Sequence, residues 1–270
     1  MKTRGRRAPH RDAALCLRRF AYGDSSLVAR LLTPQAGKLQ VLAKGAYRPT
    51  SRYFGVIDLF DDLEVVWQPR ASGALAVMTE GSILKRRRAL TRDLGRYRAG
   101  LGVLEMADLV AGEGKPDVEL FALTRAALDT LGGTPGGTEA EPRLVALAFD
   151  LKLLNHLGLC PALETCASCG RHDPGSKNGA VPFATALGGR LCHPCASNAG
   201  PGVGTASLHT LGIARSLMAT PFANLERVRV AEPALDRTTA LVQAFLDHHL
   251  ETRPRSRRTT ERPGRQPLPR

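Results

Sequence analysis

The sequence predicts an α+β protein: a small five-stranded β-barrel followed by an all-helical domain that carries a four-cysteine module. Three observations support this prediction. Residues 12–84 alternate apolar and polar side chains with a period of two, as strands do. From about residue 90 the apolar period becomes that of a helix. Two Cys-x2-Cys pairs then interrupt the helical half.

Five short strands are expected in the first part of the chain. The segment KLQVLAK places Leu39, Val41 and Ala43 on one face, and DLEVVWQ alternates in the same way. The segments LCLRRF, SLVARLL and ALAVMTE supply three further candidates, and turn signals rich in glycine and proline separate the strands. Five strands within about 70 residues fit a five-stranded OB barrel, which we assign to residues 12–84.

Helices are expected over most of residues 85–251, which we assign to one helical domain. The first helical face repeats in steps of three and four residues: Leu90, Leu94, Tyr97, Leu101, Leu104 and Asp108. Further helices are expected around residues 118–131, 144–154, 208–218 and 235–246. Residues 160–200 bear the cysteine pairs and show little regular pattern, so we expect a loop-rich module there.

Four of the six cysteines form two close pairs that are 22 residues apart: Cys166, Cys169, Cys192 and Cys195. Two residues between cysteines allow both thiolates to reach one ion at about 2.3 Å, and four thiolates leave no open position. The spacing therefore predicts one structural zinc ion rather than a catalytic site. A redox pair, an iron–sulfur cluster and a ligand role for His172 or His193 are the alternatives. Cys16 and Cys160 are expected to be small buried residues.

The formal net charge of +13 is concentrated at the two ends of the chain. Residues 1–19 carry a net +6, residues 252–270 carry another +6, and the body is nearly neutral. We expect a basic arm over residues 1–11 and a disordered basic tail over residues 252–270. Basic ends attract polyanions such as DNA or RNA, although they can also serve only to keep the chain in solution.

Apolar runs stay well below the roughly 18–20 residues that a membrane-spanning helix needs. The basic start of the chain is not followed by an apolar segment of signal-peptide length. We therefore expect no membrane partner and a cytoplasmic location.

One segment, KGAYRPTSRYF, interleaves cations with aromatic rings. Single-stranded nucleic acid requires this combination, because cations bind phosphates and aromatic faces stack on unpaired bases. The candidate binding residues here are Lys44, Tyr47, Arg48 and Arg52. Tyr53 and Phe54 follow in the same segment and can instead belong to the barrel core.

A second basic cluster lies where the strands give way to helices. It consists of Lys85, Arg86, Arg87 and Arg88, which fit phosphate contacts and an ordinary solvated linker equally well. Lys38 completes the set of candidate DNA-binding residues. Hydrolase and metalloprotease motifs are absent, and Gly37-Lys38 lacks the frame of a phosphate loop, so we expect no enzymatic activity.

Four separated motifs resemble the RecO family of bacterial recombination mediators. ALCLRRFAYGDSSLVARLLTPQAGKLQVLAKGAYRPTSRYFG resembles its opening, LLNHLGLCPALETCASCG its first zinc knuckle, FATALGGRLCHPC its second knuckle, and FLDHHLETRPRSRR its last helix and basic end. The resemblance runs over about residues 12–258 in the same order.

The resemblance implies an OB fold, a helical domain and a zinc module lodged in it. It also implies a DNA repair protein that binds single- and double-stranded DNA, anneals complementary strands and acts at the nucleoid. The partners that it implies are RecR, with which such proteins help to load RecA, and the acidic C-terminal tail of single-strand-binding protein.

Two other classes of protein remain open on the residues alone. OB barrels, basic ends and four-thiolate zinc sites also serve RNA-binding or ribosome-associated proteins. An adaptor whose zinc module binds a protein partner would share the same cysteine spacing. Competition between single-stranded DNA and structured RNA separates the first class from a DNA-binding protein.

Overall fold

The computed structural model describes residues 8–70, 75–133, 141–172, 176 and 178–250. The chain forms two compact units, Met1–Gly132 and Gly133–Arg270. The change from strands to helices, which set the expected domain boundary after residue 84, falls inside the first unit. The expected basic tail and all but the last four residues of the basic arm lie outside the described residues.

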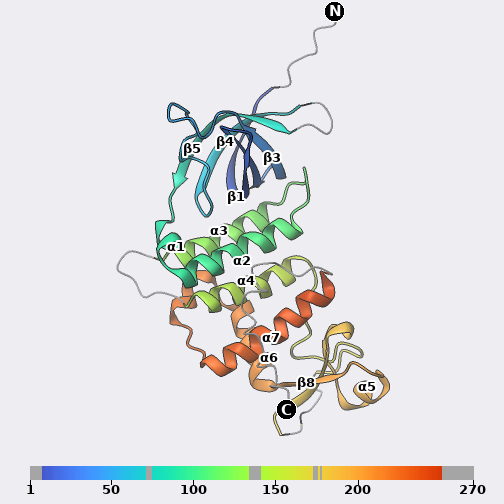
Figure 1. The fold of residues 1–270 in the computed structure, drawn as a ribbon. Coiled ribbons are helices and arrows are strands. Elements are labelled where there is room, and N and C mark those ends of the chain that lie inside the picture. The colour runs from blue at the N-terminus through green and yellow to red at the C-terminus, as the bar shows by residue number, and fades with distance from the viewer. Residues whose placement is uncertain (1–7, 71–74, 134–140, 173–175, 177, 251–270) are drawn as a thin grey trace, which may run out of the picture. The chain divides into compact units, whose positions relative to one another are not determined.

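The first unit begins with the five-stranded barrel that the sequence predicted (Figure 1). Its strands are β1 (His10–Tyr22), β2 (Ser26–Thr33), β3 (Gly37–Ala43), β4 (Asp62–Gln68) and β5 (Ala76–Lys85). They follow the order β1-β2-β3-β5-β4, and β4 closes the barrel by pairing with β1. Only the short β3–β5 pairing is parallel among these strands, which fits the five-stranded OB barrel.

Alternation decides which side chains fill the barrel. Leu27, Ala29 and Leu31 of β2 point inward, as do Val41 and Ala43 of β3, and all five are buried. Successive side chains in a strand point to opposite faces, so Val28, Arg30 and their neighbours in register lie on the outer face. Leu63, Val65 and Trp67 of β4 belong to the same core, and Leu39 packs against it, so the faces predicted for KLQVLAK and DLEVVWQ are confirmed.

Three helices complete the first unit: α1 (Arg88–Arg92), α2 (Leu94–Val110) and α3 (Val118–Gly132). The sequence predicted one helix through residues 90–108, and that prediction is wrong at Asp93. Asp93 has extended backbone and its carboxylate accepts a hydrogen bond from Arg96 N at 2.8 Å, so it caps a new helix. Leu94 therefore lies at the start of α2 and is 62% exposed instead of facing the core.

A buried carboxylate attaches α2 to the outer face of the barrel. Asp108 of α2 accepts from Arg18 Nε of β1 at 2.7 Å and from Arg30 Nη1 of β2 at 3.0 Å. Lys38 of β3 lies 3.8 Å from the same carboxylate and donates to the Asp108 carbonyl at 2.7 Å. The Asp108 side chain is 3% exposed, so its charge depends on these three cations for compensation.

The β2–β3 turn lies directly against the segment that follows α2. Lys38 N donates to Gly112 O at 3.1 Å, and Gly114 N donates back to Lys38 O at 3.0 Å. Gly37 has a φ of 64°, and a Cβ at this position would lie 1.9 Å from Lys115 O. Only glycine allows this close approach.

The described part of the second unit combines three long helices with a small sheet. The helices are α4 (Pro142–His156), α6 (Leu208–Ala219) and α7 (Glu232–His249), and α4 packs against the other two. The sheet has the order β7-β6-β8, from Gly189–Arg190, Ala180–Ala184 and Gly204–Ser207. Within residues 160–200, β6, β7, the 3-10 turn Thr185–Leu187 and helix α5 (His193–Asn198) correct the prediction of a largely irregular module. A second 3-10 turn, Phe222–Arg227, precedes α7.

Aromatic packing connects α7 to this sheet. The Phe245 ring of α7 meets the Phe183 ring of β6 edge to face, with centroids 6.5 Å apart. His249 packs on Phe245, and its Nε2 lies 3.2 Å from Thr185 O. None of the helices in the described part of the chain is long and apolar enough to cross a bilayer.

Replacing Asp108 with alanine should destabilise the barrel, because Arg18, Arg30 and Lys38 would face one another without their shared counter-ion. Arg18 and Arg30 are partly exposed, so we expect a loss of about 2–3 kcal/mol, below the roughly 3–5 kcal/mol of a fully buried pair. Urea unfolding followed by the fluorescence of Trp67, the chain's single tryptophan, reports on the barrel core where this ring lies.

The control is Asp24→Ala, which removes an exposed carboxylate from the β1–β2 turn and should change the unfolding free energy by less than about 0.5 kcal/mol. Equal stability of the Asp108 and Asp24 variants would contradict a structural role for the Asp108 cluster.

Candidate metal centre and nucleic-acid interface

The first cysteine pair lies in a tight turn. Gly170 N donates to Cys166 O at 2.8 Å, and Cys166 N donates to Arg171 O at 3.0 Å. Gly170 has a φ of 70°, the left-handed conformation that glycine adopts without strain. The turn therefore brings Cys166 and Cys169 to one side, as their spacing predicted.

The second pair spans the start of a helix. Cys192 occupies the N-cap of α5, and Cys195 follows within the first turn. Ala167 N donates to Arg190 O at 2.8 Å, and Cys192 N donates to Cys166 Sγ at 3.3 Å, so backbone contacts hold the two turns together. Gly189 has a φ of 140°, and a Cβ there would lie 2.5 Å from Ala162 O, so this approach also requires glycine.

The four sulfur atoms converge on one point. All four lie within 4.8 Å of one another, and the Sγ atoms of Cys169 and Cys192 are 3.8 Å apart. A tetrahedral ion with bonds of about 2.3 Å to sulfur requires sulfur–sulfur edges of about 3.8 Å. The site therefore fits a tetrahedral metal ion with four thiolate ligands. His172 and His193 are not part of the cluster among the described residues.

Electrostatics favour a cation at this point. Burial alone raises the pKa of Cys166, but backbone N–H groups, including that of Cys192, donate to its sulfur and lower the pKa to about 6. Hydrogen bonds with Cys192 and Cys169 raise the pKa of Cys195 to about 12, because the protonated thiol donates to these sulfurs and the thiolate cannot. A divalent cation among the four sulfurs would offset the repulsion that keeps the last thiol protonated.

The two remaining cysteines differ from each other. Cys16 is fully buried in the barrel, where burial raises the pKa of its thiol to about 12, so the expectation of a buried apolar residue is confirmed. Cys160 is exposed, so the same expectation is wrong for it. Cys160 follows the end of α4, where the chain leaves the helical core.

The segment after β3 forms a basic hollow on the barrel. The hollow has a volume of about 510 Å3 and is lined by Lys44, Arg48 and Arg52 together with Thr50, Ser51, Tyr53 and strand β5. Lys44, Tyr47 and Arg48 are exposed. Arg52 donates to Thr79 O at 3.2 Å and its guanidinium lies 5.9 Å from the centre of the Tyr53 ring. The structure thus brings three of the four predicted residues to one hollow, with Tyr47 next to Arg48 in the chain.

The two other aromatic residues of this segment have opposite positions. Tyr53 is buried in the barrel core, and its hydroxyl donates to Met78 O at 2.9 Å. Phe54 is 60% exposed. The core alternative therefore holds for Tyr53 and not for Phe54.

Lys38 and the basic run after β5 carry several structural contacts. Lys38 is engaged by Asp108, and its side chain is 13% exposed. Arg87 is buried, and its guanidinium contacts Asp62, Asp129 and the Phe60 carbonyl. Lys85 also contacts Asp129.

The two other cations of the run face solvent. Arg86 is exposed but donates to Gly55 O at 3.2 Å, whereas Arg88 is exposed at the start of α1. Arg88 thus has the position of a solvated cation, and Arg87 has that of a core cation.

Two exposed aromatic residues were not predicted as part of an interface. Phe20 is 50% exposed and Tyr22 is 57% exposed, and both lie at the end of β1 beside the β1–β2 turn. Their signal is present in the sequence, since RRFAY interleaves cations and aromatic rings as the segment after β3 does. The pattern was not interpreted as an interface because the same residues also fit the continuation of a strand.

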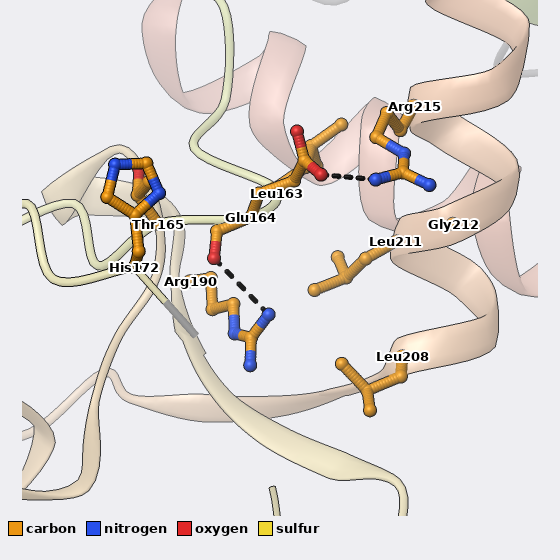
Figure 2. A pocket seen from close by; sticks show the side chains of 9 residues that line it. All are labelled: Leu163, Glu164, Thr165, His172, Arg190, Leu208, Leu211, Gly212 and Arg215. Carbon is orange, nitrogen blue, oxygen red and sulfur yellow. Dashed lines mark hydrogen bonds and ion pairs between the residues drawn. The ribbon is translucent and has the colours of Figure 1, made fainter. Parts of the chain in front are cut away.

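A second hollow, of about 510 Å3, lies beside the first cysteine turn in the second unit (Figure 2). Leu163, Leu208 and Leu211 line it together with Arg190 and Arg215. The Arg215 guanidinium pairs with Glu164, and Arg190 Nη1 donates to the Glu164 carbonyl at 3.4 Å. Figure 2 shows the Arg190 guanidinium reaching toward the leucines of α6. The hollow thus combines apolar walls with cationic groups.

Comparison with known proteins matches both halves of the chain. The family model described as Recombination protein O N terminal matches residues 8–87, and that described as Recombination protein O C terminal matches residues 91–258. The relatives include DNA repair protein RecO of Anaeromyxobacter sp. (strain K), 33% identical over 252 residues that cover 92% of this chain and 94% of the relative.

Two further relatives come from other bacteria. DNA repair protein RecO of Rhodopirellula baltica is 32% identical over 208 residues, 77% of this chain and 74% of the relative. That of Rubrobacter xylanophilus is 31% identical over 230 residues, 85% and 89% of the two chains. With an OB-type barrel, a helical region and a four-cysteine cluster in the expected order, the chain belongs to the RecO family of DNA repair proteins.

Proposed function

We propose that this protein is a recombination mediator that binds single-stranded DNA, anneals complementary strands and, with RecR, helps to load RecA onto DNA coated by single-strand-binding protein. The observation that carries the proposal is the basic hollow of Lys44, Arg48 and Arg52 on an OB barrel. OB barrels bind single strands with cations for the phosphates and aromatic faces for the bases. The protein acts in the cytoplasm, at the nucleoid, and catalyses no reaction itself.

Annealing requires that the repulsion between two phosphate backbones be neutralised. Exposed cations do this and release condensed counter-ions, which makes the affinity depend on salt. Lys44 and Arg48 are suited to this role because they are exposed and no described carboxylate pairs with them. Lys38 is less suited because it contacts Asp108, and Arg87 is less suited because it forms ion pairs with both Asp62 and Asp129. Arg88, Arg86 and Lys85 can extend the phosphate path beyond the barrel.

The hollow beside the first cysteine turn offers a place for the acidic tail of single-strand-binding protein. Apolar walls from Leu163, Leu208 and Leu211 suit apolar side chains, and Arg190 and Arg215 suit carboxylates. Glu164 pairs with Arg215, and its carbonyl accepts a hydrogen bond from Arg190.

The alternative function is RNA binding, and one feature favours it equally: OB barrels with exposed cations bind both nucleic acids. Family membership favours DNA. A competition experiment with structured RNA and a labelled single-stranded DNA probe separates the two functions. A DNA-binding mediator should stay bound to the probe when RNA is added at the same concentration, whereas an RNA-binding protein should release it.

The double variant Lys44→Gln/Arg48→Gln should weaken binding to a labelled oligothymidylate. Two lost phosphate contacts should reduce the slope of log affinity against log salt by about 1.4, since each single-strand contact contributes about 0.7. Fluorescence anisotropy across a salt series measures both affinity and slope.

The matched control is Arg229→Gln/Arg237→Gln, which removes the same charge from exposed positions of the second unit. It should leave the slope within about 0.3 of the wild type. A Lys44/Arg48 variant with the wild-type slope would exclude these residues as phosphate contacts.

We further propose that the four-cysteine site holds one structural zinc ion. Metal analysis of the purified full chain should give about one zinc per chain, and Cys166→Ser/Cys192→Ser should lose it because two of four thiolates are gone. Removal of zinc by a chelator should lower the melting temperature. Cys160→Ser, which changes an exposed thiol outside the cluster, should keep the metal. A fully folded wild-type protein that contains no metal would contradict the assignment.

A further inference from the structure

The outer face of the barrel is divided between two rows of side chains. In the first row, Arg18, Arg30 and Gln40 lie opposite one another on β1, β2 and β3. Asp108 of α2 engages both arginines of this row. The helix therefore covers this part of the outer face.

The next row is apolar. Phe20 of β1 pairs with Val28 of β2, Val28 pairs with Leu42 of β3, and Leu42 pairs with Val77 of β5. Side chains that lie opposite each other on one face have Cβ atoms about 4.5–5.5 Å apart, so these four form a continuous strip across four strands. With strands about 4.8 Å apart, the strip is about 14 Å long.

Aromatic rings flank one end of the strip. Tyr22 lies two residues after Phe20 and therefore on the same face, opposite Ser26. Tyr47 N donates to Ser25 O at 2.9 Å, and Gly45 N donates to Ser26 Oγ at 3.2 Å, so the segment after β3 runs beside the β1–β2 turn. Phe20, Tyr22 and Tyr47 are each about half exposed or more, at 50%, 57% and 46%.

Exposed aromatic rings on a strand face demand a reason, because a solvated face normally carries polar side chains. Exposed cations lie close to Tyr47 in the chain: Lys44 directly follows β3 and Arg48 follows Tyr47. Asp24 of the β1–β2 turn is the acidic neighbour of Tyr22 in the chain. The combination of aromatic faces and cations matches unpaired bases with their phosphates, not a neutral protein partner.

We propose that Phe20 and Tyr22, with Tyr47, form a base-stacking platform that lets the barrel distinguish unpaired from paired DNA. This inference rests on the proposed function and goes further: the cations bind phosphate in any DNA, whereas the platform binds only bases that are free to stack. Duplex bases are already stacked on each other, so the platform adds nothing to duplex affinity.

The test uses the full-length variant Phe20→Ala/Tyr22→Ala and fluorescence anisotropy. Its dissociation constant for a single-stranded oligothymidylate should rise at least tenfold, about 1.4 kcal/mol, within the range for loss of one or two stacked bases. Its affinity for a duplex of equal length should change less than twofold. The salt slope should match the wild type, since no phosphate contact is lost.

Two further measurements keep the outcome independent of folding. Phe20→Leu/Tyr22→Leu keeps apolar cover over Val28 but removes the π-faces, and should lose the same single-strand affinity. An abasic oligonucleotide should bind the wild type and both variants equally, because it offers phosphates without bases. Leu94→Ala, which truncates another exposed apolar side chain, is the control and should bind as the wild type does.

Single-strand affinity within twofold of the wild type in both double variants would overturn the platform and leave the phosphate-binding proposal intact. Equal loss of single-strand and duplex affinity would also overturn it. A wild-type protein that binds neither DNA would overturn the proposed function as well, so the two failures are distinguishable.

Discussion

The Asp108 carboxylate organises the first unit. One buried negative charge on α2 draws cations from β1, β2 and β3 to the same point and thereby fixes the helix on the barrel. Removing the Asp108 carboxylate from water is costly, and its three partly exposed cations compensate this cost only if they stay in place. The rigid placement of α2 follows from this requirement, and with it the close approach at Gly37.

The cations of the first unit fall into two groups, those that pair with buried carboxylates and those that are exposed. Arg18, Arg30 and Lys38 neutralise Asp108, and Arg87 neutralises Asp62 and Asp129, so these four contribute to stability. Lys44, Arg48 and Arg88 remain exposed. Net charge alone therefore overstates the surface that can meet a phosphate backbone. The helix covers one row of the outer face, and Phe20, at one end of the neighbouring apolar row, is 50% exposed.

Local pattern predicted the barrel and the cysteine site well. Period-two alternation is strong where one strand face is buried, and two Cys-x2-Cys pairs are specific because four thiolates have few other uses. The break at Asp93 escaped prediction because the apolar spacing continues across it, while the cap depends on one backbone conformation. The sheet of the second unit escaped because β7 has only two residues, too few to show a period. Burial of Arg87 could not be predicted, since its partners lie 25 or more residues away in the sequence.

The two units differ in the size of their apolar cores. The barrel unit has a large apolar core and pairs its buried charges, whereas the cysteine module has a small core that includes two of its four clustered cysteines. A metal ion would therefore act on the fold of the second unit, and exposed side chains of the first unit would act on DNA.

Strand annealing tests the central claim most directly. Two complementary oligonucleotides coated with single-strand-binding protein are mixed with the full-length protein, and duplex formation is followed by fluorescence energy transfer. The proposed mediator should accelerate annealing at about 50 mM salt, lose this effect as salt screens the phosphate contacts, and depend on Lys44 and Arg48. No acceleration by the wild-type protein at low salt, with the coated strands intact, would contradict the account.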